Sequence, residues 1–569
     1  MAKQQGLWTW RRNMRATRRW DDRGSTDGDR LKTPPSLPPG QRLRCALLAA
    51  CLGLGAVAPL QAQTGGVRLP ALGESASDDF NLSQEKRIGE QIMREIRRDP
   101  DYLDDPELLD YLLALWQPLV RAAERNGAIT ADTERLFPYE IFLVRDRAVN
   151  AFALPGGFVG VHLGLIALTA TPDELASVLA HELSHVTQRH IARNVAASSR
   201  GSSLGLAAML LGLLVASRAG SADAAQAAIV GGQAAMIQAQ LNFSRDMERE
   251  ADRTGLALMA DAGFAPAGMS AMFDKLDGAS RLNDSGGFPY LRSHPLTVDR
   301  IGEARQVVQA VAGAQPVPPA PLLHSLMQGR ARVLMDGSAQ SLRKLQGLDA
   351  RAAMVQLPLG DRLGGLYAAA LASIRLREFD RAERSSMAAV ALLAASAQAN
   401  NAPARLALAR LSLQLALSRK DALAATAALA EATPVDGSRA SLLLLADWAL
   451  IEGGDTALRR SADALQTRLA DHRDDATTWQ ALSQLLSRRG LALRAVRAEA
   501  ESQAALGNLR GAIDRLRAGQ ALVRRGGADT DFIEASVIDA RLRDLLAQRR
   551  QLLAEARRAG EWPRNEPVE

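Results

Sequence analysis

The chain has almost no cysteine: among its 569 residues only Cys45 and Cys51 occur, close together in one apolar run near the N-terminus. This scarcity excludes a disulfide framework and a cysteine-ligated zinc site in the body of the protein. Aromatic residues make up only 4%, whereas hydrophobic residues make up 47% and alanine, leucine and arginine are abundant. This composition favours helices, and the length suffices for two or three domains.

The body of the chain also lacks a charge excess. Residues 1–62 carry eleven lysines and arginines against four acids, a formal net charge of +7. Since the whole chain carries +6, the remainder carries −1. A nearly neutral body offers no electrostatic footprint for nucleic acid. We therefore expect no nucleic-acid partner.

The N-terminal segment has the order of a secretory leader. The basic stretch Arg42-Leu43-Arg44 precedes the apolar run, and small residues around Ala62 suit cleavage. We predict a disordered basic extension at residues 1–44 and a signal peptide at residues 45–62. The run is short for a membrane span. An uncleaved anchor and a lipidated Cys51 are the alternative interpretations.

An HExxH motif, His181-Glu182-Leu183-Ser184-His185, lies inside a helix-favouring stretch. On a helix, positions i and i+4 are only about 40° apart, so both imidazoles can bind one zinc ion from the same face. Glu182 would lie beside the metal, where it can take a proton from a bound water. The alternative is a surface helix with two incidental histidines.

The residues before the motif predict short helices and a small sheet. A helix is expected from the N-cap Ser83 to Arg98, and another begins at Asp105-Pro106. Strands are expected at residues 138–144 and 158–162. Zinc peptidases commonly hold an extended substrate strand against such a sheet.

The remaining chain divides at a Pro/Ala linker, residues 311–321. We predict a zinc metallopeptidase domain at 63–310 and a helical-repeat domain at 322–569. The apolar run 204–216 is too short to span a bilayer. It is interpreted as a buried helix or hairpin that covers the site, in preference to a flap that contacts a membrane or an unfolded client.

The C-terminal part is almost entirely helical in pattern. Units of a turn followed by alanine recur at residues 378–382, 453–457 and 507–512, and Trp479-x-x-Leu482-x-x-x-Leu486 resembles the first helix of a tetratricopeptide repeat. Because the spacing is irregular, we predict a degenerate repeat solenoid, with an ordinary helical bundle as the alternative. The fold class is thus mainly α (α+β).

A third ligand is needed to complete a zinc site, and a second helix offers one. Glu248 and Asp252 are four residues apart and share a face, whereas Glu250 is out of phase and would point away. A carboxylate ligand with a nearby acid that hydrogen-bonds a ligand histidine is sound zinc chemistry. Taken alone, this acidic cluster would be a solvated helix face.

Together these residues resemble the HtpX-type gluzincin peptidases, and within them the BepA-like periplasmic zinc metalloproteases with a tetratricopeptide-repeat tail. The resemblance rests on four motifs: Ala180 to His190, Glu248-x-x-x-Asp252, Asn150-Ala151-Phe152-Ala153-Leu154-Pro155-Gly156-Gly157, and Ser293-His294-Pro295-Leu296 before Arg300-Ile301. It is strong over residues 81–301 and only architectural beyond about residue 320.

The resemblance implies one Zn²⁺ per chain, bound by His181, His185 and Glu248, with Glu182 as the general base. Asp252 becomes the acid beside a ligand histidine, described in the family as a proton donor, although hydrogen bonding to a ligand histidine favours an orienting role. Asn150, Ala151, Phe152 and Ala153 would face the substrate. His294 would occupy the open zinc position and hold the enzyme latent, the alternative being a histidine that merely precedes Pro295. His190, about 180° from His181 on a continuous helix, is expected to pack or hydrogen-bond rather than bind metal.

The resemblance further implies a zinc endopeptidase of the periplasm that acts on misfolded or stalled outer-membrane proteins. Its repeat domain would recruit clients or the outer-membrane assembly machinery, and peripheral membrane contact is compatible with the apolar run. The alternative is a chaperone or scaffold that works through the repeat domain and keeps its zinc site latent.

Overall fold

The computed structural model describes residues 81–197, 244–282, 289–311, 321–352, 355–432, 437–526 and 531–558. The predicted extension, the signal peptide, the apolar run 204–216 and linker residues 312–320 lie outside the described residues. By its internal contacts the chain divides into residues 1–68 and 69–569, and everything described below belongs to the second unit.

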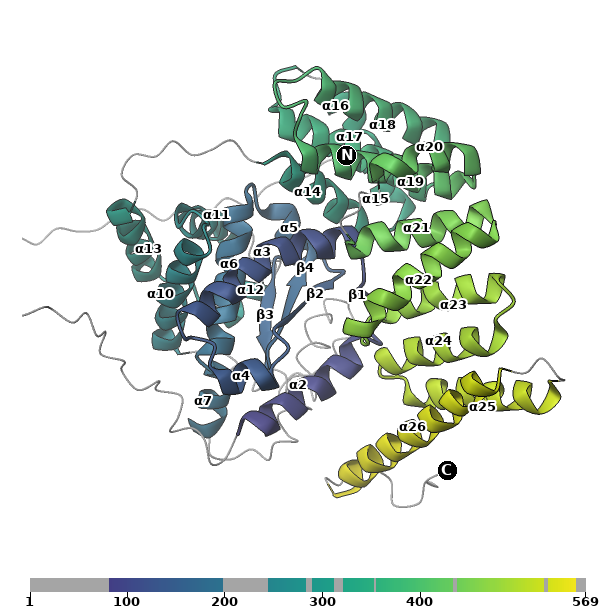
Figure 1. Cartoon of the computed structure of the whole chain (residues 1–569). Coiled ribbons are helices and arrows are strands. Elements are labelled where there is room, and N and C mark those ends of the chain that lie inside the picture. The colour runs from purple at the N-terminus through teal and green to yellow at the C-terminus, as the bar shows by residue number, and fades with distance from the viewer. Residues whose placement is uncertain are drawn as a thin grey trace, which may run out of the picture. The chain divides into compact units, whose positions relative to one another are not determined.

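A four-stranded sheet forms the centre of the N-terminal part (Figure 1). Its strands are β1 (Tyr102–Leu103), β2 (Glu140–Val144), β3 (Ala151–Leu154) and β4 (Phe158–His162), in the order β1-β2-β4-β3. β2 and β4 pair in parallel, and the other two pairings are antiparallel. The two strands expected from the sequence are confirmed as β2 and β4. The tight turn from β3 to β4 uses Gly156 and Gly157, both with positive φ, which glycine tolerates without strain.

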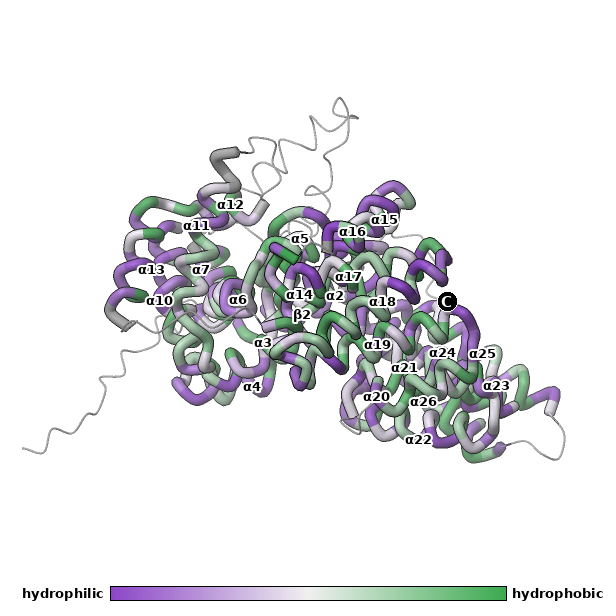
Figure 2. Tube along the Cα trace, turned by 90° about the horizontal axis from the view of Figure 1, so that it is seen from above, coloured by the Kyte–Doolittle hydropathy of each residue, from purple (hydrophilic) through white to green (hydrophobic). Residues whose placement is uncertain are grey.

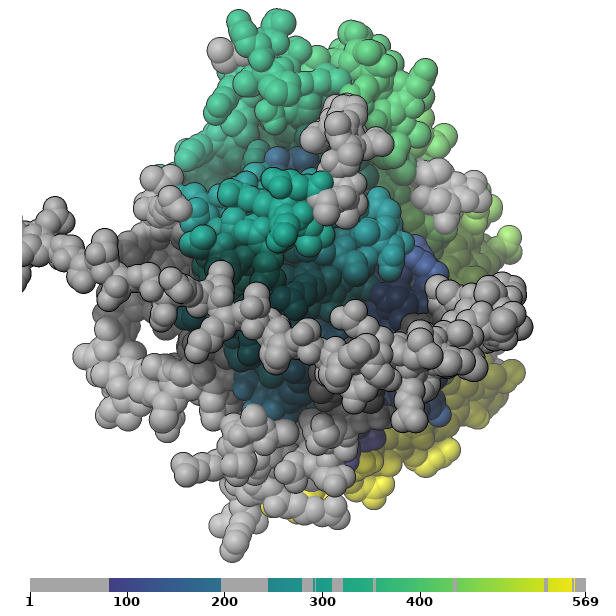
Figure 3. All heavy atoms as spheres, turned by 90° about the vertical axis from the view of Figure 1, so that its left-hand side faces the viewer, coloured from purple at the N-terminus to yellow at the C-terminus, as the bar shows by residue number. Residues whose placement is uncertain are grey.

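Ten helices of the described chain surround this sheet: α2 (Leu82–Ile96), α3 (Pro106–Arg125), α4 (Ala131–Leu136), α5 (Leu163–Leu168), α6 (Pro172–Thr187), α7 (His190–Ala197), α10 (Arg245–Asp261), α11 (Ala267–Leu282), α12 (Pro289–Ser293) and α13 (Val298–Val311). The prediction that Ser83 caps the first of these helices is wrong. Asn81 caps α2 instead, because its side chain accepts from the Gln84 amide while the Gln84 side chain caps Asn81 in return. Figure 3 shows the teal residues of α10, α11 and α13 gathered on one face.

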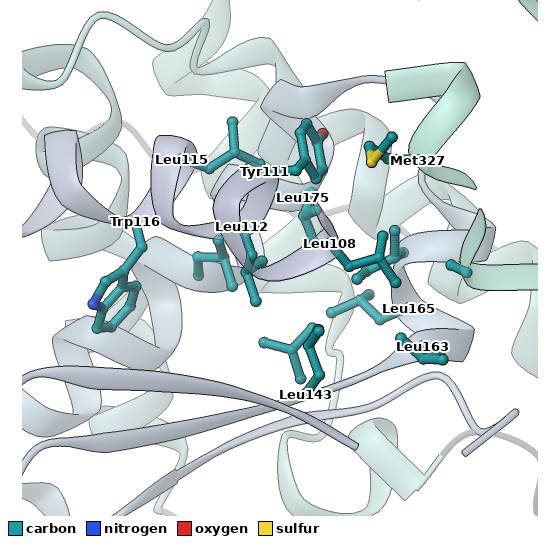
Figure 4. Packing of buried hydrophobic residues seen from close by; sticks show 14 of the residues in the cluster. Leu108, Tyr111, Leu112, Leu115, Trp116, Leu143, Leu163, Leu165, Leu175 and Met327 are labelled. Atoms are coloured by element: carbon teal, nitrogen blue, oxygen red, sulfur yellow. The ribbon is translucent and has the colours of Figure 1, made fainter. Parts of the chain in front are cut away.

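The alternation of β2 places its side chains in two cores. Ile141 and Leu143 pack with α3, α5 and α6, whereas Phe142 packs with α2 on the opposite face of the sheet. Figure 4 shows the first core, where Leu112 and Trp116 of α3 lie over the sheet. Both side chains are fully buried. Each large buried apolar side chain contributes roughly 1.5–3 kcal/mol, so this core fixes where the sheet and α6 lie.

The C-terminal part is entirely helical over its described residues, as expected. Its helices are α14 (Leu322–Leu334), α15 (Ala339–Gln346), α16 (Leu348–Ala352), α17 (Leu359–Arg375), α18 (Phe379–Ala394), α19 (Ala402–Arg419), α20 (Ala422–Ala432), α21 (Arg439–Glu452), α22 (Asp455–Asp471), α23 (Ala476–Arg488), α24 (Ala492–Ala505), α25 (Leu509–Arg525) and α26 (Phe532–Arg558). Successive helices pack in hairpins, and the predicted turn-then-alanine units fall where one helix ends and the next begins. In Figure 2 these helices alternate hydrophobic and hydrophilic residues, as expected for helices buried on one face.

One apolar core continues from the N-terminal part into the first C-terminal helices. It includes Leu108 and Leu165 as well as Leu326 and Leu371. α14 packs against both α5 and α17. Among the described residues, no helix is long and apolar enough to span a bilayer.

Candidate metal centre

The helix that carries the HExxH motif, α6, begins with strong signals. Thr171 caps it by accepting from the Glu174 amide, Pro172 occupies the first turn, and two acids favour the positive end of the helix dipole. From Glu174 to Val186 every side chain is buried. α6 packs against β3, α3, α10 and α11, so the two motif histidines lie in the interior of the N-terminal part.

The second helix of the site, α10, is capped by Ser244 and brings Glu248 and Asp252 to α6. Gly255 permits the close approach: a Cβ atom at this position would lie 3.2 Å from the backbone nitrogen of His181. Both carboxylates are buried, Glu248 at 1% and Asp252 at 7% relative exposure.

His181, His185, Glu248 and His294 form one buried cluster, in which one ligand atom from each lies within 4.8 Å of all the others. Nε2 of His181 is 2.9 Å from Nε2 of His185 and 3.5 Å from Oε2 of Glu248. Nδ1 of His294 is 2.9 Å from Oε1 of Glu248 and 3.3 Å from Nε2 of His181. These are the residues that the sequence nominated as ligands and latch. Their donor atoms come from α6, from α10 and from the segment between α12 and α13, and they converge on one point, as a metal site requires.

Glu182 is fully buried beside this cluster. Neither of its carboxylate oxygens has a hydrogen-bond partner among the described residues, and its Oε1 lies 3.6 Å from Nε2 of His294. A buried carboxylate without hydrogen bonds is costly, so it is expected where a reacting group or a metal-bound ligand would supply the missing partner.

Asp252 lies behind His181 rather than in the cluster. Its Oδ1 is 2.9 Å from Nδ1 of His181. Arg300 holds Asp252 with two hydrogen bonds of 2.6 and 2.8 Å, and also lies 2.8 Å from Oε2 of Glu248. The carboxylate is therefore placed to accept from Nδ1 of His181, the ring nitrogen opposite the one that faces the cluster. No role was predicted for Arg300, although it closes one of the four motifs on which the resemblance rests.

Electrostatics in the cluster follow from these contacts. Burial lowers the pKa of His181, but hydrogen bonds to Asp252 and Glu248 outweigh it and raise that pKa to about 9. Burial and the charge of His181 lower the pKa of His185 well below its usual range. Burial raises the pKa of Glu248, yet His294 and His181 outweigh it and hold the carboxyl ionised.

The expected position of His190 on the far side of the helix is wrong. α6 ends at Thr187, and Arg189 adopts a left-handed conformation with φ 51° that turns the chain back. As a result Nδ1 of His190 lies 2.9 Å from Nδ1 of His185. The predicted character of His190, a hydrogen-bonding residue outside the ligand set, agrees with this contact.

Asn150 directly precedes β3, and Ala151, Phe152 and Ala153 are its first three residues. In the described sheet β3 pairs only with β4, so its other edge has no strand partner there. β3 also packs beside α6. The segment expected to face substrate is thus the sheet edge next to the motif helix.

A HExxH helix whose histidines meet a glutamate from a second helix, beside a small sheet, defines a gluzincin-type metallopeptidase. The Peptidase family M48 model matches residues 117–308. The beta-barrel assembly-enhancing protease of Vibrio cholerae is 34% identical over 353 residues, which cover 61% of this chain and 67% of that protein. The chain belongs to the M48 metallopeptidases, in the family of the beta-barrel assembly-enhancing proteases.

Two further relatives show how the similarity is distributed. The beta-barrel assembly-enhancing protease of Escherichia coli is 33% identical over 260 residues, 46% of this chain and 51% of that protein. The mitochondrial metalloendopeptidase OMA1 of Schizosaccharomyces pombe is 29% identical over 232 residues, 39% of this chain and 61% of that protein. The chain thus spans about half the length of the first of these relatives.

Proposed function

We propose that this protein is a zinc endopeptidase of the bacterial periplasm that degrades misfolded or stalled outer-membrane proteins. The observation that carries the peptidase assignment is the convergence of His181, His185 and Glu248 beside Glu182, whose carboxylate accepts no hydrogen bond from the described residues. The substrate class is supported by the names of the relatives, which refer to β-barrel assembly, and the location by the predicted signal peptide.

The cluster fits zinc in its donor set. Two imidazoles and one carboxylate, with a fourth position for water, are the ligands of many catalytic zinc sites. We assign His181, His185 and Glu248 as the protein ligands. When bound there, zinc would act as a Lewis acid that acidifies water and polarises a peptide carbonyl.

The protein residues would then move the protons. Glu182 takes a proton from the attacking water and delivers it to the nitrogen of the leaving amine. Asp252 accepts from His181 and keeps its Nε2 directed at the metal, so we assign it an orienting role. The edge of β3 that has no strand partner among the described residues, with Asn150 to Ala153, would hold the substrate backbone as an added strand.

We further propose that His294 keeps the site latent. With three histidines and Glu248, zinc would have four protein ligands and no open position for water, as in structural zinc sites. The contacts of His294 with His181 and Glu248 support this arrangement. Activation would require the segment that carries His294 to move away.

The test is digestion of a purified, unfolded outer-membrane β-barrel protein by the zinc-loaded full-length chain. We expect His294→Ala to cleave faster than wild type, and Glu182→Gln to cleave about 10²–10⁴-fold more slowly while binding zinc normally. Glu174→Gln is the matched control, since Glu174 is a buried glutamate of the same helix that pairs with Lys275 instead. Equal cleavage by the Glu182 and Glu174 variants would contradict the assignment.

The closed arrangement also supports a second candidate, a chaperone or scaffold that works through the helical C-terminal part. In this case that part recruits clients or the outer-membrane assembly machinery, and proteolysis is dispensable. A cellular role that survives Glu182→Gln would favour this second function; its loss would favour the peptidase.

A further inference from the structure

His185 makes a second contact that the catalytic scheme does not use. Its Nε2 faces the metal cluster, and its other ring nitrogen, Nδ1, lies 2.9 Å from Nδ1 of His190. The opposite nitrogen of His190, Nε2, is 3.3 Å from Oε2 of Glu250. Arg193 donates to the same carboxylate oxygen at 2.9 Å. The result is a linear chain from His185 through His190 to Glu250.

The backbone is built to place His190 at this point. Arg189, the residue with φ 51°, separates α6 from α7, and its side chain donates to Glu85 of α2 at 3.0 Å. Glu85 is itself buried, at 3% relative exposure. The turn is therefore held from a third helix, and His190, the first residue of α7, is fully buried against His185.

The hydrogens in this chain can be assigned from chemistry alone. A histidine that binds metal through Nε2 carries its ring hydrogen on Nδ1, so Nδ1 of His185 must donate and Nδ1 of His190 must accept. His190 then carries its own hydrogen on Nε2, which faces Glu250. A carboxylate only accepts, so Glu250 fits this end of the chain as the hydrogen-bond acceptor.

The two ligand histidines are therefore supported from the same helix. Asp252 of α10 accepts directly from His181, and Glu250 of α10 acts on His185 through the ring of His190. Residues 248, 250 and 252 of one helix thus serve the cluster in three different ways.

We propose that His190 and Glu250 are positioning residues of the metal centre, which fix the tautomer and ring orientation of His185. This inference rests on the metal site of the proposed function. Partners of this kind behind a ligand histidine are typically worth 10–100-fold in metal affinity, so the proposal has a readout that does not depend on peptidase activity.

The test measures the zinc affinity of the full-length protein by competition with a chromogenic chelator. His190→Leu fills the volume but removes the acceptor, and we expect its affinity to fall about 10–100-fold. His190→Asn restores an acceptor near the position of Nδ1, and we expect it to remain within about threefold of wild type. Glu250→Leu is the second variant, because the Glu250 side chain is 29% exposed and its replacement leaves the interior packed. It should weaken binding in the same direction.

His324→Leu is the matched control for loss of a buried histidine. His324 is 1% exposed and bonds to Tyr111 and Thr169 instead of the cluster, so this variant should lower the melting temperature without changing zinc affinity. Equal weakening by His190→Leu and His190→Asn, or no weakening by either His190→Leu or Glu250→Leu, overturns the positioning role. Wild-type protein that binds no zinc would overturn the metal site itself, and this role with it.

Discussion

A buried ion pair ties the first C-terminal helix to the N-terminal part, and its loss should be costly. Arg330 of α14 donates to both carboxylate oxygens of Asp105 at 2.7 and 2.8 Å and to the hydroxyl of Tyr367 at 3.0 Å. Glu107 lies 3.6 Å from the same guanidinium. The Arg330 and Asp105 side chains are only 5% and 10% exposed.

Replacing Arg330 with methionine keeps the bulk of the side chain but leaves two buried carboxylates without their cation. Breaking one partner of a buried pair costs about 3–5 kcal/mol, and we expect this loss in the free energy of unfolding. Burial already raises the pKa of Glu107, and losing Arg330 raises it further. Because the folded variant then holds a proton that the unfolded chain releases, the loss should be smallest in acid and grow as the pH rises.

Urea unfolding, followed by circular dichroism, measures this loss. The control is Arg419→Met, whose partners Asp380 and Glu383 are 92% and 50% exposed, so less than about 1 kcal/mol should be lost. Adding Asp105→Asn to Arg330→Met should recover part of the stability, since one of the stranded charges is removed. An Arg330 variant no less stable than the Arg419 variant would refute the reasoning.

Three further predictions concern backbone packing, a buried carboxylate and metal binding. Gly89→Ala would place a Cβ atom far inside van der Waals distance of the Pro155 carbonyl oxygen. We therefore expect the free energy of unfolding in urea to fall by about 1–3 kcal/mol, and an unchanged value would contradict this close approach. The pKa of Asp475 is lowered to about 2, because hydrogen bonds to Arg439 outweigh the effect of burial. Because the pKa of Asp475 is lower in the folded protein than in the unfolded chain, the ionised carboxylate stabilises the fold above about pH 4. Asp475→Asn should therefore lower the free energy of unfolding by about 2 kcal/mol at pH 7 and by little near pH 2. A loss that does not depend on pH would refute this. Removing metal with a chelator should lower the melting temperature of wild type, and added Zn²⁺ should restore it; a melting temperature unchanged by either step would argue against a resident metal.

The site residues could be named from sequence because their chemistry is local. The two histidines of HExxH are four residues apart on one helix, and Glu248 and Asp252 are four residues apart on another. Residues at this spacing share a face of a helix, so each pair can be recognised from the sequence. The strands β2 and β4 could also be predicted from the sequence, because each is a short run rich in aromatic and β-branched residues between turn signals. His294 was nominated by resemblance alone, because nothing in its local sequence distinguishes a metal-facing histidine from one that precedes a proline.

What the sequence determined by itself was therefore the repertoire: two histidines able to share a metal, two acids on one face of a second helix, a helical C-terminal part and a small sheet. The resemblance then assigned Glu248 to the metal. What only the tertiary structure decided was which further groups, beyond the predicted Asp252, contact the ligand histidines and their partners. The break at Arg189 returns His190 to His185, and Arg300 reaches Asp252 across 48 residues. Such contacts depend on where one helix stops and how two helices pack, and these depend on interactions between residues far apart in the chain rather than on local spacing.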